Sequence, residues 1–388
     1  MIKDIIMLAS DIAILPILTT SALYGRYTKK KYDAGIGSMP LINTPNHKKS
    51  LELYGHKTQS FVSYTWFQTQ DFDIVFCKKS NPTFLNRLSS TYKAMIHATL
   101  NYKVVFTYMN GILTINTPIT SKLEPYLLKL SKTKVVVLQY GSDVQVFEHS
   151  TNLLFKHMAC QDYGRKYNDI GVTKKNIKKW SKHADYILTG EDWIEFLPYW
   201  DEVISAHFAF DVKNTPIPKI NTKPKEYVVL HAPNHRNIKG TQVFIEAVDK
   251  LKTKGYPIRI EVIEKKSNAE VLKSIEQCFL VADQLTLGWY AMLAVEGMSY
   301  GKPVLCYIRQ DFLNFYEKIG VLGEGELPLV QCTHNSDVVA KVIEELILNE
   351  EKYREVSRKS REFVDKHHSI EYIGRVFDRI YKEVMKEC

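Results

Sequence analysis

The stretch from Ala282 to Ile308 has the sequence ADQLTLGWYAMLAVEGMSYGKPVLCYI, which is typical of a strand, a glycine turn, a helix and a second strand. Gly288 allows the backbone to turn tightly and to approach a ligand. The helix that follows presents free N–H groups with a partial positive charge, which suits a diphosphate. We therefore expect an anion-binding unit of an α/β fold here, with Trp289 and Tyr290 beside the anion.

Glu296 comes two turns into this predicted helix, among the apolar residues Leu293, Val295 and Met298. A carboxylate in such surroundings is unfavourable unless it has a hydrogen-bonding partner. One interpretation is that Glu296 binds a ribose hydroxyl. The alternative is that it pairs with a basic neighbour.

The same alternation of strands and helices extends through the first half of the chain. Short β-branched or aromatic runs recur between helical stretches, as expected for a parallel sheet built from βαβ units. The runs are FVSYTW, DIVFC, KVVFTY, KVVVLQY, ADYILTG and VISAHFAF, and crossover helices are predicted at Asn43 to Tyr54, Ser121 to Leu130 and Lys174 to His183.

A length of 388 residues favours two domains with a cleft between them. The stretch NTPIPKINTKPK is rich in proline and lysine and is predicted to be the linker. Beyond it the strand rhythm resumes, and Ser369 is predicted to cap a last amphipathic helix. The predicted parts are a membrane-associating segment at 1–35, a first Rossmann-like lobe at 36–215, a linker at 216–226, a second Rossmann-like lobe at 227–365 and a terminal helix at 366–388.

The segment around Glu296 resembles the second-lobe signature of retaining GT-B glycosyltransferases of the family-four type. That family has two glutamates separated by seven residues, followed by a Gly-x-Pro-Val step. Glu296 matches the second glutamate, which in the family holds the ribose of the donor, and Gly301, Pro303 and Val304 match the later step. Gly288 stands where the family has its first glutamate, which contacts the donor sugar.

This resemblance implies a two-lobed GT-B fold in which the terminal helix packs back on the first lobe. It also leaves the identity of the donor sugar open, because the first glutamate is absent. Asp283 and Gln284, just upstream, are candidates for the missing polar contact to the sugar.

The basic loop HAPNHRNIKGT carries a second part of the resemblance. It lies between a predicted strand and a predicted helix, where a cation can stand beside a bound diphosphate. Lys239 and Gly240 match the family pattern, whereas Asn234 stands where the family has arginine. Arg236 or His235 is the candidate substitute for that arginine. The alternative is an ordinary basic surface loop.

In the first lobe, Asp143 follows a strongly apolar strand within YGSDV, and open α/β sheets bind ligands at the carboxyl ends of their strands. We expect Asp143 either to hold the acceptor or donor sugar, or to cap its own loop. Gly35 and Gly37 in AGIGSMP resemble the loop that faces the diphosphate from the first lobe. Asp185 is interpreted as structural.

Composition narrows the class of protein. With 45% hydrophobic and 24% charged residues, the chain is typical of a globular protein. The six cysteines lie far apart, which indicates free thiols in a reducing cytoplasm. The sequence contains no GxxxxGK[ST], HExxH or GxSxG motif and no closely spaced aspartate pair for a metal-bound sugar nucleotide. We therefore expect no cofactor and no metal, with the nucleotide sugar as a substrate.

The amino-terminal segment is nearly apolar from Ile5 to Tyr24 and is followed by a basic run at Arg26, Lys29, Lys30 and Lys31. Asp11 and Pro16 within it disfavour a membrane-spanning helix. We expect a hairpin or a surface-lying segment whose basic run faces anionic lipid headgroups. A first strand and helix buried in the first lobe is the alternative.

These observations lead to an expected function. The net charge of +9 suits an anionic partner such as a phosphorylated substrate or an acidic membrane, and we expect no nucleic acid partner. The expected enzyme is a retaining, metal-independent glycosyltransferase of the cytoplasm, peripheral on the cell membrane. It would move a hexose or acetamidohexose from a UDP- or GDP-linked donor to a glycan or lipid-linked saccharide during surface polysaccharide synthesis. A sugar-nucleotide epimerase of the same fold and a non-catalytic membrane-bound scaffold are the alternatives.

Overall fold

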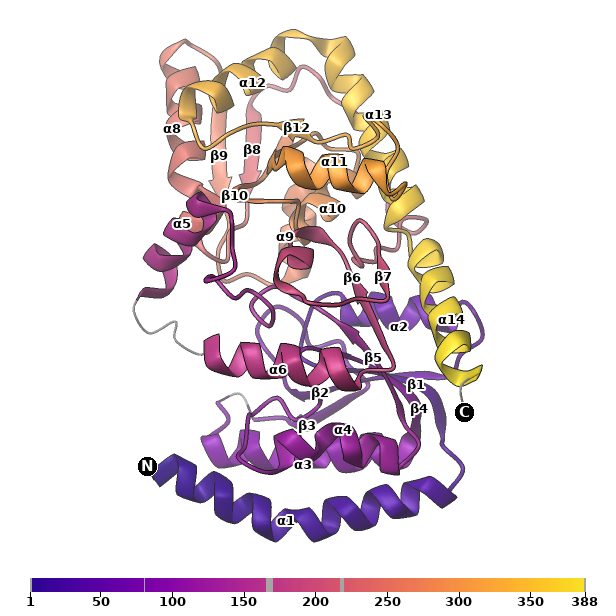
Figure 1. Cartoon of the computed structure of the whole chain (residues 1–388). Helices are drawn as coiled ribbons and strands as arrows, with labels where there is room; N and C mark the ends of the chain where they lie inside the picture. Colours follow the sequence, from indigo (N-terminus) through magenta and orange to yellow (C-terminus); the bar gives the residue numbers. More distant parts are fainter. Residues whose placement is uncertain (1, 80, 165–169, 217–219, 387–388) are drawn as a thin grey trace.

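The computed structural model describes residues 2–79, 81–164, 170–216 and 220–386. Figure 1 shows two α/β units, one above the other, with the last helix of the chain running from the second unit back to the first. Each unit has its own parallel sheet. The predicted pair of Rossmann-like lobes is therefore confirmed, while the predicted linker falls partly on residues 217–219, outside the described ranges.

The first sheet has the strand order β3-β2-β1-β4-β5-β6-β7, and all its pairings are parallel. Parallel neighbours need long crossovers, which are supplied mostly by helices. The strands are β1 (Tyr32–Ser38), β2 (Thr58–Tyr64), β3 (Ile74–Cys77), β4 (Tyr102–Tyr108), β5 (Lys134–Leu138), β6 (Tyr186–Thr189) and β7 (Glu202–Val203). The helical segments are α2 (Thr44–Glu52), α3 (Phe84–Asn101), α4 (Thr120–Leu130), α5 (Leu153–Tyr163), α6 (Ile170–His183) and the 3-10 helix η2 (Glu191–Phe196).

Strand β1 corrects the expectation for Gly35 and Gly37, which lie inside this central strand rather than in a phosphate-facing loop. A Cβ atom at Gly35 would stand 2.4 Å from the ring of Tyr102, and one at Gly37 would stand 2.1 Å from the carbonyl oxygen of Phe61. Both glycines are therefore required for close packing within the sheet. A glycine-rich strand lacks the β-branched residues by which strands are usually predicted.

The second sheet has five parallel strands in the order β12-β11-β10-β8-β9. Its strands are β8 (Tyr227–His231), β9 (Ile258–Val262), β10 (Leu280–Gly288), β11 (Val304–Ile308) and β12 (Val330–Gln331). Its helices are α7 (Arg236–Lys239), α8 (Thr241–Thr253), α9 (Asn268–Gln277), α10 (Met292–Ser299), α11 (Gln310–Lys318), α12 (Ser336–Leu348) and α13 (Glu350–His367).

Helix α1 (Ile2–Tyr27) is one continuous helix along α3 and α4 at the outer end of the first unit (Figure 1). The buried carboxylate of Asp11 accepts hydrogen bonds from the backbone N–H groups of Ile119 and Thr120, at 2.7 and 3.1 Å. It also accepts one from the hydroxyl of Tyr92, at 2.8 Å. Asp11 thus satisfies amides at the start of α4, which has no side-chain cap of its own.

The opposite face of α1 is exposed and largely apolar. By length and composition α1 could cross a membrane, but one side of it is packed on the lobe. The structure has one continuous helix and not a hairpin, and one side of this helix packs in the first lobe, as the alternative expects in part. Contact of its other side with a membrane stays a prediction. The exposed apolar residues are Ile2, Ile5, Leu8, Ile12, Ile17, Leu23, Tyr24 and Tyr27.

Two helices hold the lobes together. Helix α14 (Ile370–Lys386) belongs to the chain beyond the second sheet, yet it packs against α2 in the first lobe, as predicted. The hydroxyl of Ser369 accepts from the N–H of Tyr372 at 3.2 Å, which confirms the predicted cap. In the other direction, α5 leaves the first lobe and packs on α7 and β10 of the second. Because each lobe contributes a helix that packs on the other, the two lobes are held in one arrangement.

Candidate active site between the lobes

The cleft lies where the carboxyl ends of strands from both sheets meet. In open parallel sheets, ligands bind outside these ends, where the strand order reverses. The order reverses between β1 and β4 in the first sheet and between β8 and β10 in the second. A cavity of about 410 Å³ is lined by residues that follow β1, β5, β6, β8 and β10.

A second hollow of about 530 Å³ adjoins this cavity. Asn234 and Lys239 of the second lobe line both spaces, as does Trp66 of the first lobe. Glu296 lines the second hollow, on its α10 side, but not the first cavity. The two spaces together therefore extend from Glu296 past Lys239 to the first lobe.

Lys239 is the buried cation of the cleft. It ends α7, only 8% of it is exposed, and its Nζ lies 3.2 Å from Oδ1 of Asp283. The other oxygen of Asp283 accepts from the N–H of Ala291 at 2.8 Å, just before α10. The ammonium is thus held beside the start of α10, where an anion would meet both a positive charge and the helix N-terminus.

Glu296 is 3% exposed, and its Oε1 accepts a hydrogen bond from Nδ2 of Asn268 at 2.5 Å. Burial, together with the nearby carboxylate of Asp283, raises the pKa of Glu296 to about 7. Its partner is an amide and not a cation, so the alternative of a basic neighbour is wrong. The carboxyl group therefore retains the ability to bind a polar group in the hollow that it lines.

The residues just before Lys239 fall into two groups. Asn234 and His235 line the cavity, and Nε2 of His235 lies 3.1 Å from the hydroxyl of Tyr163 on α5. Arg236 turns away and forms two hydrogen bonds to Glu264, at 2.9 and 2.7 Å, near the surface. Arg236 lines neither cavity in this arrangement, so its predicted contact with a bound diphosphate finds no support here and stays a prediction.

The side-chain amide of Gln284 is also hydrogen-bonded to backbone groups. Its Nε2 donates to the carbonyls of Trp289 and Tyr307 at 2.8 and 2.7 Å, and its Oε1 accepts from the N–H groups of Thr286 and Leu287, both at 2.7 Å. These bonds shape the turn at the end of β10. They leave no free amide group for the predicted contact with a sugar.

Trp289 and Tyr290 are about 1% exposed and serve mainly as packing residues. The indole N–H of Trp289 donates to the carbonyl of Ser205 at 3.0 Å, and the hydroxyl of Tyr290 lies 2.9 Å from Nε2 of His368. Their side chains line the cavity wall but their polar atoms are used within the protein. The predicted anion contact at these two positions depends on their backbone N–H groups, and it stays a prediction.

Gly240 and Gly288 both adopt left-handed backbone conformations, with φ of 75° and 94°. A side chain at Gly240 would approach Leu285 to 2.9 Å, so glycine is required where α7 gives way to α8. A Cβ at Gly288 would stand 2.6 Å from Cγ and Cδ of Arg309. Position 288 therefore faces an arginine stem instead of an open sugar site.

Asp143 holds its own loop. Its carboxylate accepts from the N–H groups of Tyr140 and Met109, at 2.9 and 3.1 Å. Burial raises the pKa of Asp143 to about 7. The neighbouring residues Ser142 and Gln145 line the cavity. The geometry favours the expectation that Asp143 caps its own loop. It gives no support to the expectation that Asp143 holds the acceptor or donor sugar.

Glu191 is a site residue that sequence reasoning missed. It lies two residues beyond the end of β6, is 4% exposed and lines the cavity. Its φ of 58° is unusual for a residue with a side chain, and its Oε1 has no hydrogen-bond partner among the described residues. Burial and the adjacent Asp192 raise the pKa of Glu191 well above its usual range. The signal available in the sequence was a pair of acids immediately after the apolar run ADYILTG.

Gln139, the first residue after β5, was missed as well. It is fully buried, lines the cavity, and both atoms of its amide lack partners within the described part of the chain. His207 also lines this space, and its Nε2 lies 2.7 Å from the carbonyl oxygen of Gln139. Burial lowers the pKa of His207 to about 4, so the imidazole is neutral.

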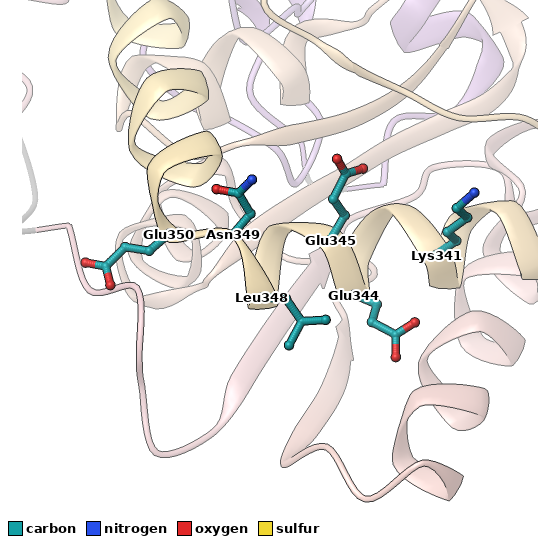
Figure 2. A pocket seen from close by; sticks show the side chains of 6 residues that line it. All are labelled: Lys341, Glu344, Glu345, Leu348, Asn349 and Glu350. Atoms are coloured by element: carbon teal, nitrogen blue, oxygen red, sulfur yellow. The ribbon is translucent and has the colours of Figure 1, made fainter.

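A separate hollow on the outer surface of the second lobe has, among its described lining residues, no buried polar atom without a partner. Figure 2 shows its lining along the end of α12 and the start of α13. Each of its three glutamates pairs with a basic residue. The lining residues are Lys341, Glu344, Glu345, Leu348, Asn349 and Glu350. Across the described residues, no group of three or more His, Cys, Asp or Glu side chains could hold a metal ion.

No protein-family model and no curated protein matches this sequence. Solved structures do match. Sucrose-phosphate synthase from Thermosynechococcus elongatus has a TM-score of 0.62 at 12% identity, covering 93% of this chain and all of that one. Anabaena HepE, in complex with UDP and glucose, has a TM-score of 0.56 at 12% identity, covering 89% and 98%. A Listeria monocytogenes protein assigned as a UDP-N-acetylglucosamine 2-epimerase has a TM-score of 0.52 at 13% identity, covering 93% and 98%. These likenesses show that the chain has the GT-B fold.

Proposed function

We propose that this protein is a glycosyltransferase that binds a nucleotide sugar between its two lobes. The observation that carries the proposal is the single continuous cleft in which Lys239 and Glu296 both take part. A nucleoside diphosphate has a hydroxyl-bearing ribose and an anionic diphosphate, and the cleft offers a carboxyl group and a cation for these two parts.

In this proposal the diphosphate lies at Lys239 and the start of α10. As the bond to the sugar breaks, negative charge develops on the departing diphosphate, and a buried ammonium stabilises it strongly because little water screens the charge. Asp283 keeps the ammonium in place before the donor arrives. Asn234 and His235 line the same space and are proposed to donate further hydrogen bonds.

Glu296 is proposed to accept hydrogen bonds from the ribose hydroxyls. Its amide partner Asn268 orients the carboxyl group, and the N–H of Asn268 donates to the carbonyl of Gln68 in the first lobe at 3.1 Å. The ribose site is thereby linked to both lobes. UDP and GDP are the proposed nucleotides, and HepE, which shares the fold, has UDP and glucose bound in its structure.

Retention of the anomeric configuration, independence of metal ions and transfer of a hexose or acetamidohexose are further parts of the proposal. They rest on the resemblance around Glu296 and Lys239. A glycan or lipid-linked saccharide in surface polysaccharide synthesis is the proposed acceptor, because α1 presents an apolar face outward beside a basic run. We propose that α1 lies on the anionic inner face of the cell membrane.

Thermal shift with UDP, GDP and ADP tests the proposal, followed by product analysis with the sugar nucleotides of the best base. We expect one nucleoside diphosphate to raise the melting temperature of the wild type and to do so less in Lys239→Ala and Glu296→Ala. If no nucleotide stabilises the protein, and Glu296→Ala has no effect in cells, the chain is instead the non-catalytic scaffold.

A sugar-nucleotide epimerase is the second candidate, favoured by the fold shared with the Listeria protein. An epimerase needs no acceptor. Incubation with UDP-N-acetylglucosamine alone separates the two activities: release of an epimeric product without acceptor supports the epimerase, and acceptor-dependent release of UDP supports the transferase.

A further inference from the structure

We propose that Glu191 and Gln139, both on the first lobe, bind hydroxyl groups of the transferred sugar. This inference rests on the proposed glycosyltransferase function and assigns the part of the site that reads the sugar. Neither residue belongs to the motifs around Lys239 and Glu296.

The first argument is the place of the two side chains. Gln139 follows β5 and Glu191 follows β6, and these strands are neighbours in the parallel sheet. Their carboxyl ends therefore lie at the same edge, and both side chains line the same cavity of about 410 Å³. An acid and an amide in the wall of one cavity offer donors and acceptors together, which suits a ring that carries several hydroxyl groups.

The second argument is that both groups are buried without full use of their polar atoms. Oε1 of Glu191, and Oε1 and Nε2 of Gln139, have no partner among the residues that the structure describes. Buried polar groups are nearly always hydrogen-bonded, so these exceptions need an explanation, and in a cavity wall a bound ligand supplies one. A sugar hydroxyl in the cavity would supply the missing bond to each residue.

The third argument is the backbone of Glu191. A left-handed conformation at a residue with a side chain persists only where its surroundings enforce it. The N–H of Glu191 donates to the carbonyl of Ser205 at 3.1 Å, and its carbonyl accepts from the hydroxyl of Tyr316 at 2.7 Å. Contacts from both lobes thus hold Glu191 in this conformation, which is typical of strain kept at functional sites.

The fourth argument is the position relative to the proposed diphosphate. Lys239 and Asp283 act electrostatically on the carboxyl group of Glu191, and Lys239 lines the same cavity. The sugar is bonded to the diphosphate, so it must lie close to Lys239. Position 288 is unsuitable for this contact, because Arg309 fills the space that a side chain there would need.

The experiment uses the best donor and its deoxy analogues, each lacking one hydroxyl, with the wild type, Glu191→Ala, Glu191→Gln, Gln139→Ala and the control Glu148→Gln. Glu148 is an exposed acid of the same lobe. We expect Glu191→Ala and Gln139→Ala to lower kcat/KM for the full donor by about 10- to 100-fold. Affinity for the nucleoside diphosphate alone should not change.

The deciding result is the analogue comparison. With one deoxy donor, Glu191→Ala and the wild type should have equal kcat/KM, because the hydroxyl that Glu191 binds is gone. Glu191→Gln should restore much of the activity, since a neutral amide can replace a protonated acid. An equal penalty with every analogue, or no penalty at all, overturns the inference. Inactivity of Glu191→Gln equal to that of Glu191→Ala also overturns it, because proton acceptance would then be the role.

Failure of the proposed function is a different result. In that case the wild type binds no nucleotide and transfers no sugar from any donor. If the wild type transfers sugar and only the analogue comparison fails, the function stands and the inference falls. Melting temperatures of all variants show whether an inactive one is folded.

Discussion

The ammonium of Lys239 lies 3.2 Å from the carboxylate of Asp283 inside the cleft between the lobes. Asp283 is fully buried, and its second oxygen holds the backbone at Ala291, where α10 begins. The ion pair therefore links the basic loop of one βα unit to the helix start of another. A diphosphate at this place would interact with both elements.

Lys239→Ala is expected to abolish binding of a diphosphate and to destabilise the fold. Removing the lysine leaves a buried carboxylate without its counter-ion, and breaking such a pair typically lowers the free energy of unfolding by about 3 kcal/mol. Urea unfolding measures this change, and Lys239→Ala with Asp283→Asn should be less destabilised than Lys239→Ala alone. Lys254→Ala, which breaks the surface pair with Glu344, is the control and should not change the unfolding curve.

Glu296→Ala is expected to weaken the affinity for the preferred nucleoside diphosphate by about tenfold, since a hydrogen bond to the ribose is lost. Isothermal titration calorimetry measures it. The same variant should show no weakening toward the 2′,3′-dideoxy nucleotide, which lacks the ribose hydroxyls. An equal loss with both nucleotides would place Glu296 away from the ribose.

The same residue gives a pH dependence of stability. Burial raises the pKa of Glu296 from 4.5 to about 7, so the folded state holds its proton more tightly than the unfolded state. The stability from this proton is fully present below about pH 4.5 and is lost as the pH rises through 7, by up to about 3 kcal/mol. We expect Glu296→Gln to flatten part of the decline in unfolding free energy between pH 5 and 8. An unchanged slope would show that Glu296 does not titrate there.

Asp11→Ala is expected to release α1 from the first lobe. The carboxylate accepts hydrogen bonds from two backbone N–H groups and from the hydroxyl of Tyr92. In the variant these donors would lose that acceptor. A loss of about 2 kcal/mol in unfolding free energy follows. Limited proteolysis should cut α1 faster in this variant. Thr20→Ala, at an exposed position of the same helix, is the control and should leave the cleavage rate unchanged.

Ile12→Glu combined with Ile17→Glu is expected to reduce binding to anionic vesicles by at least about tenfold, because both side chains are on the exposed apolar face of α1. Sedimentation with vesicles of phosphatidylglycerol measures the bound fraction. Surface substitutions are preferable to deletion of α1, since deletion would also remove Asp11. Wild-type binding by the double variant would exclude α1 as the membrane contact.

The second lobe was predictable from the sequence because its signals are local. The apolar strands, the glycine at 288 and the acid at 296 follow one another within one βα unit, and neighbours in sequence remain neighbours in space. The terminal helix was predictable for the same reason, since Ser369 and the apolar stripe after it belong to one segment.

The direction of Arg236 and the commitment of Gln284 were not predictable, because each depends on a partner that the fold brings near. Arg236 turns to Glu264 after β9, and Gln284 bonds to the carbonyl of Tyr307 in β11. The positions of these residues in the sequence do not indicate these contacts. The same is true of Gly35, whose requirement comes from the ring of Tyr102 on the neighbouring strand.

By itself the sequence determined the two parallel-sheet lobes, the buried acid at 296 and the lysine at 239, since periodicity and local motifs specify elements and the ends of strands. Only the tertiary structure decided which polar groups stay free in the cleft. Glu191 and Gln139 are distinguished by polar atoms that have no partner among the described residues, and that depends on all the surrounding elements at once. The physical reason is that hydrogen-bond satisfaction is a property of the packed interior.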